Sequence, residues 1–201
     1  MIKNIIFDFG DVFLNLDKAG PSKVLKQKGI DSMINEDEEL LRTYEVGKVT
    51  SEEVILHFNK NYSLKNDEFK WIWNSMLLDF PDHRFDFLKN LKSSNKYRLF
   101  LLSNTNEIHI DWVKEDWGME RYDEFKSCFE KFYLSHEIHL RKPNTDIYEF
   151  VLSENQLKPD ETFFIDDTKV NTDAASAIGI KTWNIDPRNE DITNLTSMIK
   201  P

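Results

Sequence analysis

The sequence predicts an α/β fold: a Rossmann-like parallel sheet with helices on both faces, and a small helical cap inserted after the first strand. Three observations support this prediction. Short apolar runs are separated by long helix-like segments. Several of these runs end directly in polar or acidic residues, as strands do where a parallel sheet faces a ligand. Between Asp17 and Pro81 the chain has no convincing strand and is instead amphipathic with helical spacing.

Five runs have the length and composition of buried strands. They are Ile2–Phe7, Arg98–Leu102, Lys131–Leu134, Thr162–Ile165 and Lys181–Ile185. Helix-like segments lie between them, for example Asp82–Ser93 and Thr145–Glu154. This alternation is typical of parallel strands joined by helical crossovers.

The segment between the first two strands has its own helix signals. In "TSEEVILHFNKNY", Thr50 and Glu53 have the spacing of a capping box at a helix start. The stretch "NDEFKWIWNSMLL" repeats the amphipathic pattern. We therefore expect a core domain formed by residues 1–16 and 82–201, and a cap domain formed by residues 17–81.

Composition limits the classes of function. The chain has 201 residues and a net charge of −10, which argues against nonspecific nucleic-acid binding, because such binding depends on clustered Lys and Arg. Charges interrupt every apolar segment before it reaches membrane-spanning length. The single cysteine, Cys128, excludes an internal disulfide, and the first residues do not resemble a signal peptide. We therefore expect a cytoplasmic protein without membrane or nucleic-acid partners.

Acidic residues end two of the predicted strands. Asp8 follows the first apolar run, and burying its charge is costly unless a partner compensates it. Asp8 therefore either turns the chain at a surface or works with a group from elsewhere. Asp166 and Asp167 follow the fourth run, where two like charges repel each other and a Mg²⁺ ion would relieve the repulsion. The alternative for this pair is a solvent-exposed turn.

Two further strand ends carry groups suited to an oxyanion. In "RLFLLSNTNEIH", the Ser103 hydroxyl, the Asn104 amide and the backbone N–H groups of a following helix could bind a phosphate, although Ser103 could also be a plain helix cap. Lys142 precedes Pro143 and could neutralise phosphate charge, although most lysines simply lie on the surface. Because the carboxyl ends of parallel strands meet at one edge, we expect all these residues to converge on a site for Mg²⁺ and a phosphoryl group.

The order of these motifs resembles the haloacid dehalogenase (HAD) superfamily over the whole chain. The matching motifs are "FDFGD", "LLSNTN", "RKPNTDIY" and "FFIDDTKVNTDAASAIGI". The insertion resembles the small helical cap of the superfamily's first cap class. The segments "YEVGKVTSEEV" and "SNTNEIH" resemble the branch that contains sugar-phosphate phosphatases, including glucose-1-phosphate phosphatases.

The resemblance implies a role for each motif residue. It makes Asp8 the nucleophile that forms an aspartyl-phosphate. The groups it assigns to Mg²⁺ are Asp8, the carbonyl of Gly10, Asp167, and Asp166 either directly or through water. Those it assigns to the phosphate are Ser103, Asn104 and Lys142, and Gly10 is expected to contact the substrate as well. It gives Asn171 a weaker role in orienting the metal site.

One position departs from the family pattern. Most HAD phosphatases carry a second Asp two residues after the nucleophile as general acid and base, and this chain has Gly10 there. Asp11 is acidic but lies one residue out of register. The branch that the chain resembles also tends to have glycine at this position, so Gly10 does not by itself indicate an inactive enzyme.

We therefore predict a Mg²⁺-dependent phosphatase that acts on a small phosphorylated metabolite, which we expect to be a sugar phosphate. One alternative is a metal-independent 2-haloacid dehalogenase, which shares the nucleophile, the serine and the lysine. The pair Asp166 and Asp167 argues against it, because a metal-free nucleophile gains nothing from two neighbouring negative charges. The other alternative is a catalytically weak phosphate-binding regulatory module, which only Gly10 favours.

Overall fold

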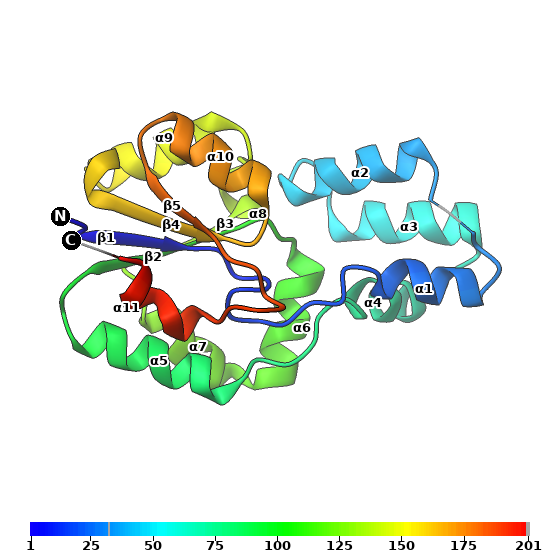
Figure 1. Cartoon of the computed structure of the whole chain (residues 1–201). Helices are drawn as coiled ribbons and strands as arrows, with labels where there is room; N and C mark the ends of the chain where they lie inside the picture. Colours follow the sequence, from blue (N-terminus) through cyan, green and yellow to red (C-terminus); the bar gives the residue numbers. More distant parts are fainter. Residues whose placement is uncertain (32, 200–201) are drawn as a thin grey trace.

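The computed structural model describes residues 1–31 and 33–199 and has a five-stranded sheet at its centre (Figure 1). All neighbouring strands are parallel, in the order β3-β2-β1-β4-β5. The strands are β1 (Asn4–Phe7), β2 (Arg98–Ser103), β3 (Lys131–Leu134), β4 (Thr162–Asp166) and β5 (Lys181–Asn184). The predicted parallel α/β sheet is confirmed.

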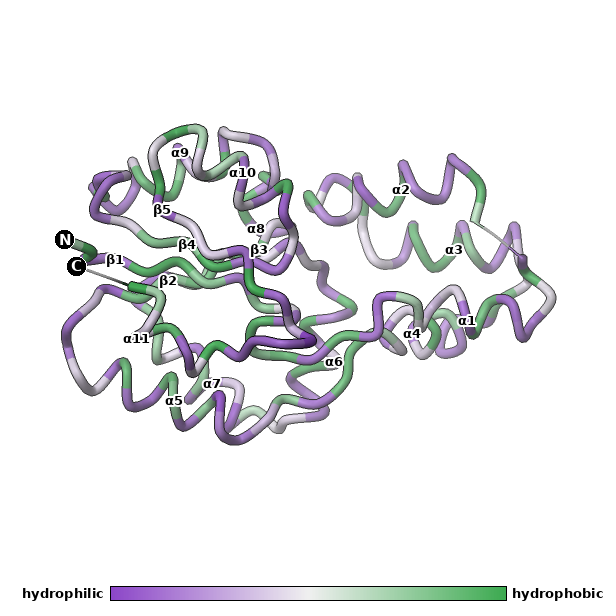
Figure 2. Tube along the Cα trace, in the orientation of Figure 1, coloured by the Kyte–Doolittle hydropathy of each residue, from purple (hydrophilic) through white to green (hydrophobic). Residues whose placement is uncertain are grey.

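Helices cover both faces of this sheet, as predicted. One face carries α5 (Asp82–Ser93), α6 (Glu107–Trp117), α7 (Met119–Ser127) and α11 (Leu195–Met198), and the other carries α9 (Thr145–Glu154) and α10 (Lys169–Ala177). The central strand shows why both faces must be covered. Ile5 and Phe7 pack into one core and Ile6 into the other, and all three are fully buried. Figure 2 accordingly shows hydrophobic residues concentrated along β1. The remaining short elements are α8 (Ser135–Ile138), η1 (Pro159–Glu161) and η2 (Ile192–Asn194).

Four helices separate β1 from α5 and lie to one side of the sheet (Figure 1). They are α1 (Gly20–Gln27), α2 (Asn35–Glu45), α3 (Ser51–Tyr62) and α4 (Asn66–Asn74). The Thr50 capping box is present, since the Glu53 N–H donates to Thr50 Oγ1 at 3.2 Å and the Thr50 N–H donates to Glu53 Oε2 at 2.7 Å. These helices bury an apolar cluster of their own, including Phe58 and Phe69. The helical insertion after the first strand is therefore present, while its domain boundaries stay a prediction.

The chain enters and leaves this insertion through two segments that bond to each other. Asn15 N–H donates to the Asp79 carbonyl at 3.0 Å, and Asp17 N–H donates to the Met76 carbonyl at 2.8 Å. A second contact between the insertion and the sheet-bearing part lies elsewhere, at the end of α2. His139 Nδ1 lies 2.8 Å from the Val46 carbonyl oxygen, which follows the end of α2. These contacts fix the insertion over the carboxyl edge of the sheet.

The element ends differ slightly from the predicted ones. β1 begins at Asn4 rather than Ile2, and β5 ends at Asn184 rather than Ile185. β2 and β4 each extend one residue further, because Ser103 and Asp166 themselves pair with the neighbouring strands. The predicted bounds of α5 and α9 are confirmed. Within residues 1–31 and 33–199, no helix combines the length and the apolarity needed to cross a bilayer.

Candidate active site

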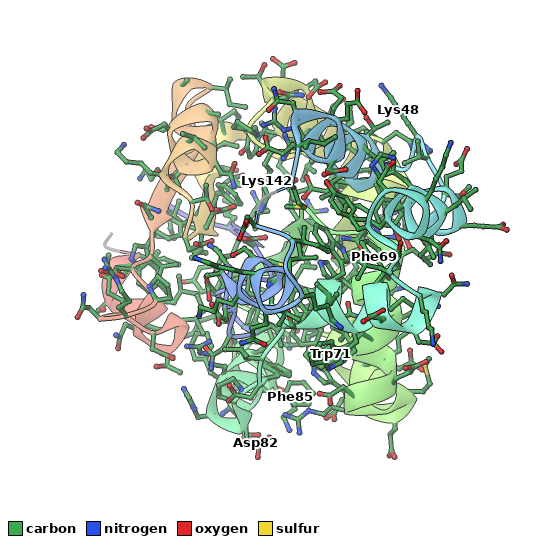
Figure 3. The ribbon with its side chains drawn as sticks, turned by 90° about the vertical axis from the view of Figure 1, so that its right-hand side faces the viewer. Lys48, Phe69, Trp71, Asp82, Phe85 and Lys142 are labelled. Atoms are coloured by element: carbon green, nitrogen blue, oxygen red, sulfur yellow. The ribbon has the colours of Figure 1, made fainter. Side chains whose placement is uncertain are left out.

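Lys142 lies at the centre of the site, between two carboxylates from neighbouring strands. Its Nζ is 2.7 Å from Asp8 Oδ1 and 2.7 Å from Asp166 Oδ2. Lys142 is only 1% exposed and Asp166 is fully buried. Figure 3 labels Lys142 near the middle of the view, away from the outline of the molecule. A surface location for this lysine, the simplest alternative, is therefore wrong.

Asp166 is held by neutral donors as well as by Lys142. The Thr168 N–H donates to Asp166 Oδ1 at 2.8 Å. The Asn171 side-chain N–H₂ lies 3.0 Å from both carboxylate oxygens. Both oxygens of Asp166 therefore already accept hydrogen bonds within the protein, which suits a residue that positions Lys142.

Burial and charge act in opposite directions on the central pair. Burial raises the pKa of Asp8 to about 7, because the attraction of Lys142 offsets only part of the cost of desolvation. For Lys142, burial by itself would lower the pKa, but Asp166 and Asp8 outweigh it and raise the pKa. The amine therefore stays protonated and keeps its positive charge at the carboxyl edge of the sheet.

Asp167 faces a second lysine, which the sequence reasoning did not single out. Lys18, in the segment leading into the insertion, forms ion pairs with Asp167 and, at 3.1 Å, with Asp11. Burial raises the pKa of Asp167 despite this pairing. Asp11 also accepts a hydrogen bond from the Leu16 N–H at 3.0 Å, so its carboxylate is turned toward the connecting segment. No sequence pattern marks Lys18, because it reaches Asp167 only through the fold.

The donor set at this edge fits a divalent cation of the Mg²⁺ type. Asp8, Asp166 and Asp167 each offer a carboxylate oxygen, and these oxygens lie within 4.8 Å of one another. Hard cations such as Mg²⁺ prefer oxygen ligands of this kind. Asp166 is fully buried and is held by Lys142, Thr168 and Asn171. Asp167 is partly exposed and its partner Lys18 is about half exposed, so Asp8 and Asp167 are the carboxylates best placed to receive a cation.

Asn104 and Ser103 stand beside this centre, at the end of β2. The Asn104 side chain donates to the Lys142 carbonyl and accepts from the Lys142 N–H, both at 2.9 Å. This pair of bonds holds the backbone of Lys142, whose bond to Pro143 is cis. Asn104 thus has a clear structural contact with the lysine. Ser103 is buried and lines a cavity next to Gly10.

Gly10 lines the same cavity, and the Leu16 side chain packs closely against it. A Cβ atom at this position would lie 2.6 Å from Leu16 Cδ1, the end of a flexible side chain. Asp11 does not line this cavity but a different hollow, which it shares with Asp167 and Lys18. The Asp11 carboxylate is already engaged by Lys18 and by the Leu16 N–H, which argues against Asp11 as a replacement for the acid that is absent at position 10.

Comparisons with known proteins agree with this geometry. Residues 5–185 match the family model described as haloacid dehalogenase-like hydrolase. The chain therefore belongs to that family of hydrolases, and the predicted family is confirmed.

Relatives in the family have more specific descriptions. The D-ribitol-5-phosphate phosphatase of Bacteroides thetaiotaomicron is 26% identical, with 91% of each chain covered. A HAD family enzyme of the same organism, solved in complex with magnesium and inorganic phosphate, is 32% identical with a TM-score of 0.84 and covers 97% of this chain and 99% of its own. A predicted HAD-like hydrolase of Porphyromonas gingivalis is 28% identical with a TM-score of 0.85, covering 100% and 99%.

Proposed function

We propose that this chain is a Mg²⁺-dependent phosphatase that hydrolyses a small phosphomonoester, a sugar or polyol phosphate, through an aspartyl-phosphate on Asp8. The observation that carries the proposal is the buried Lys142 between Asp8 and Asp166, with Asp167 in reach of the same point. The phosphatase and the magnesium–phosphate complex among the relatives support it.

Each residue has a role in the proposed reaction. An Asp8 oxygen forms a bond to phosphorus while the bond from phosphorus to the leaving oxygen breaks, and that oxygen takes a proton from solvent. Water then attacks the phosphorus of the aspartyl-phosphate, which releases phosphate and regenerates Asp8. Lys142 balances the charge of Asp8 and of the phosphoryl oxygens, and Ser103 binds one of these oxygens.

Asp8, Asp167 and the Gly10 carbonyl would hold Mg²⁺, with Asp166 acting through Lys142 or through a bound water. The metal would supply positive charge opposite the phosphoryl oxygens. In this proposal Asn104 positions Lys142 and offers its remaining amide N–H to the phosphate. Asn171 orients Asp166. We also propose that residues 1–16 and 82–201 form the catalytic core and that residues 17–81 form the cap that shapes the substrate pocket. A cytoplasmic location stays a prediction.

The decisive experiment measures phosphate release with and without a chelator, using p-nitrophenyl phosphate and a panel of sugar and polyol phosphates. We expect activity that needs Mg²⁺ and that falls by more than about 10³-fold in Asp8→Asn, since the amide cannot act as nucleophile. Asp82→Asn is a control, because the Asp82 side chain is exposed and its carboxylate bonds to Arg121 in α7. Retention of a tenth of the activity in Asp8→Asn would refute the mechanism.

Two further assays on the wild-type protein test the alternative functions, a 2-haloacid dehalogenase and a phosphate-binding regulatory module. Halide release from 2-haloacids that is unaffected by the chelator would indicate the dehalogenase. Phosphate binding without turnover on any substrate would indicate the regulatory module.

A further inference from the structure

A cavity of about 130 Å³ lies between the carboxyl edge of the sheet and the helical insertion. Ser103 and Gly10 line it from the sheet side, and Trp73 and Met76 line it from α4 and the residues that follow. Pockets for drug-sized ligands are larger, roughly 300–1,000 Å³. The cavity is therefore sized for a group of a few carbon atoms attached to a phosphate at the neighbouring site.

The charges of the cavity wall exclude an anionic group. No lysine or arginine is among the described residues that line it, and Glu45 is the acid among them. Glu45 is paired across the insertion boundary with Arg141, whose Nη2 lies 2.9 Å from Glu45 Oε2. Because Arg141 is already paired with Glu45 and does not line the cavity, a carboxylate or second phosphate there would be desolvated without a cation of its own, which is costly.

His109 presents a hydrogen-bond acceptor to the cavity. It lies in the first turn of α6 and is buried. Its Nδ1 is 2.9 Å from Asn74 Oδ1, and because that oxygen can only accept, Nδ1 carries the proton. Burial lowers the pKa of His109 to about 3, so the ring is neutral and Nε2 is the unprotonated nitrogen. His109 lines the cavity and Asn74 does not. Because Nδ1 is bonded to Asn74, Nε2 is the ring nitrogen that a ligand in the cavity can reach.

Trp73 adds a fixed aromatic wall. Its ring stacks on the imidazole of His109, with centroids 5.3 Å apart and an interplanar angle of 6°. Its Nε1 is closed off from the cavity, so Trp73 contributes the face of its ring and not its N–H. A hydroxyl group of a polyol can donate to the acceptor on His109 while the adjoining carbon atoms pack on this ring. Figure 3 labels the neighbouring residue Trp71, which is 61% exposed, in contrast to Trp73 on the cavity wall.

We propose that His109 Nε2 accepts a hydrogen bond from a hydroxyl of the leaving group, and that the enzyme thereby selects phosphate esters of small uncharged polyols or sugars. This inference rests on the proposed phosphatase function and names the part of the substrate that the cavity recognises. Esters with an anionic leaving group, such as phosphoglycolate, are rejected by the same wall.

The test compares kcat/KM for three probes: an alditol phosphate, p-nitrophenyl phosphate and phosphoglycolate. For the wild type we expect the alditol phosphate to be hydrolysed well and phosphoglycolate least. In His109→Phe, which keeps a ring against Trp73, the ratio of kcat/KM for the alditol phosphate to that for p-nitrophenyl phosphate should fall roughly 10–100-fold, as for loss of one buried hydrogen bond. His83→Phe is the matched control, since His83 is exposed and contacts Asp191.

Two further measurements separate recognition from folding. His109→Gln carries an amide oxygen that can accept, so it should recover part of the ratio if it folds. ¹⁵N NMR of the wild-type ring should show a neutral histidine protonated at Nδ1, and the opposite tautomer or a charged ring would overturn the inference. An unchanged ratio in His109→Phe would overturn it too. If the wild type hydrolyses none of the three probes, the proposed function fails; if it hydrolyses p-nitrophenyl phosphate but prefers phosphoglycolate to the alditol phosphate, only this inference fails.

Discussion

Replacing Lys142 by Met should destabilise the metal-free protein strongly. The variant removes the cation that lies 2.7 Å from both Asp8 and Asp166, in a place where the lysine is 1% exposed. Met preserves much of the volume and length of the side chain. What remains is a pair of buried carboxylates without a positive partner, and removing one partner from a buried ion pair costs about 3–5 kcal/mol.

This cost has a measurable size. For a chain of 150–250 residues, a loss of 1 kcal/mol lowers the melting temperature by roughly 2–4 °C. We therefore expect Lys142→Met to melt roughly 6–20 °C below the wild type in a chelator-containing buffer. The measurement is calorimetry or circular dichroism at neutral pH.

Two partner variants test the cause. In Lys142→Met/Asp166→Asn, one of the repelling charges is removed, so part of the lost stability should return. Lys169→Met is a control, because Lys169 is exposed and pairs with Asp173 one helical turn away. A single variant within 2 °C of the wild type, or a double variant less stable than the single one, would refute the assignment of Lys142 as the charge partner of both acids.

Three other perturbations test neighbouring parts of the structure. Lys18→Met removes the ion pair with Asp167 and should tighten Mg²⁺ binding up to about fivefold in calorimetry, since exposed pairs contribute up to about 1 kcal/mol; weaker binding would contradict this. Gly10→Asp should flatten the dependence of rate on leaving-group pKa, as an added general acid contributes about 10²–10⁴-fold; a wild type that already shows no dependence would contradict it. Burial tends to raise the pKa of Asp191, but hydrogen bonds led by the Thr193 N–H hold that pKa well below its ordinary value. Asp191→Asn should therefore reduce the free energy of unfolding at pH 7 and lose this effect as the pH falls below about 4, and an equal deficit at pH 3 and pH 7 would contradict it.

The sequence by itself determined which residues stand at the carboxyl edge. An apolar run that stops at Asp8 or at Asp166 indicates the strand end, and parallel strands bring such ends together whatever the details of packing. The same reasoning found the bounds of α5 and α9, because these helices have regular apolar spacing. It misplaced the start of β1 by two residues, since Ile2 is apolar and buried although it lies outside the strand.

Only the tertiary structure decided which groups bond to which. Asp166 and Asp167 are adjacent in the chain, yet one is bound by Lys142 and Asn171 and the other faces Lys18. The protonated nitrogen of His109 is set by Asn74, 35 residues earlier and in the helical insertion. Which groups become partners depends on the directions in which their side chains point when distant segments pack together. Periodicity along the chain carries no information about those directions, because each depends on how a distant segment packs.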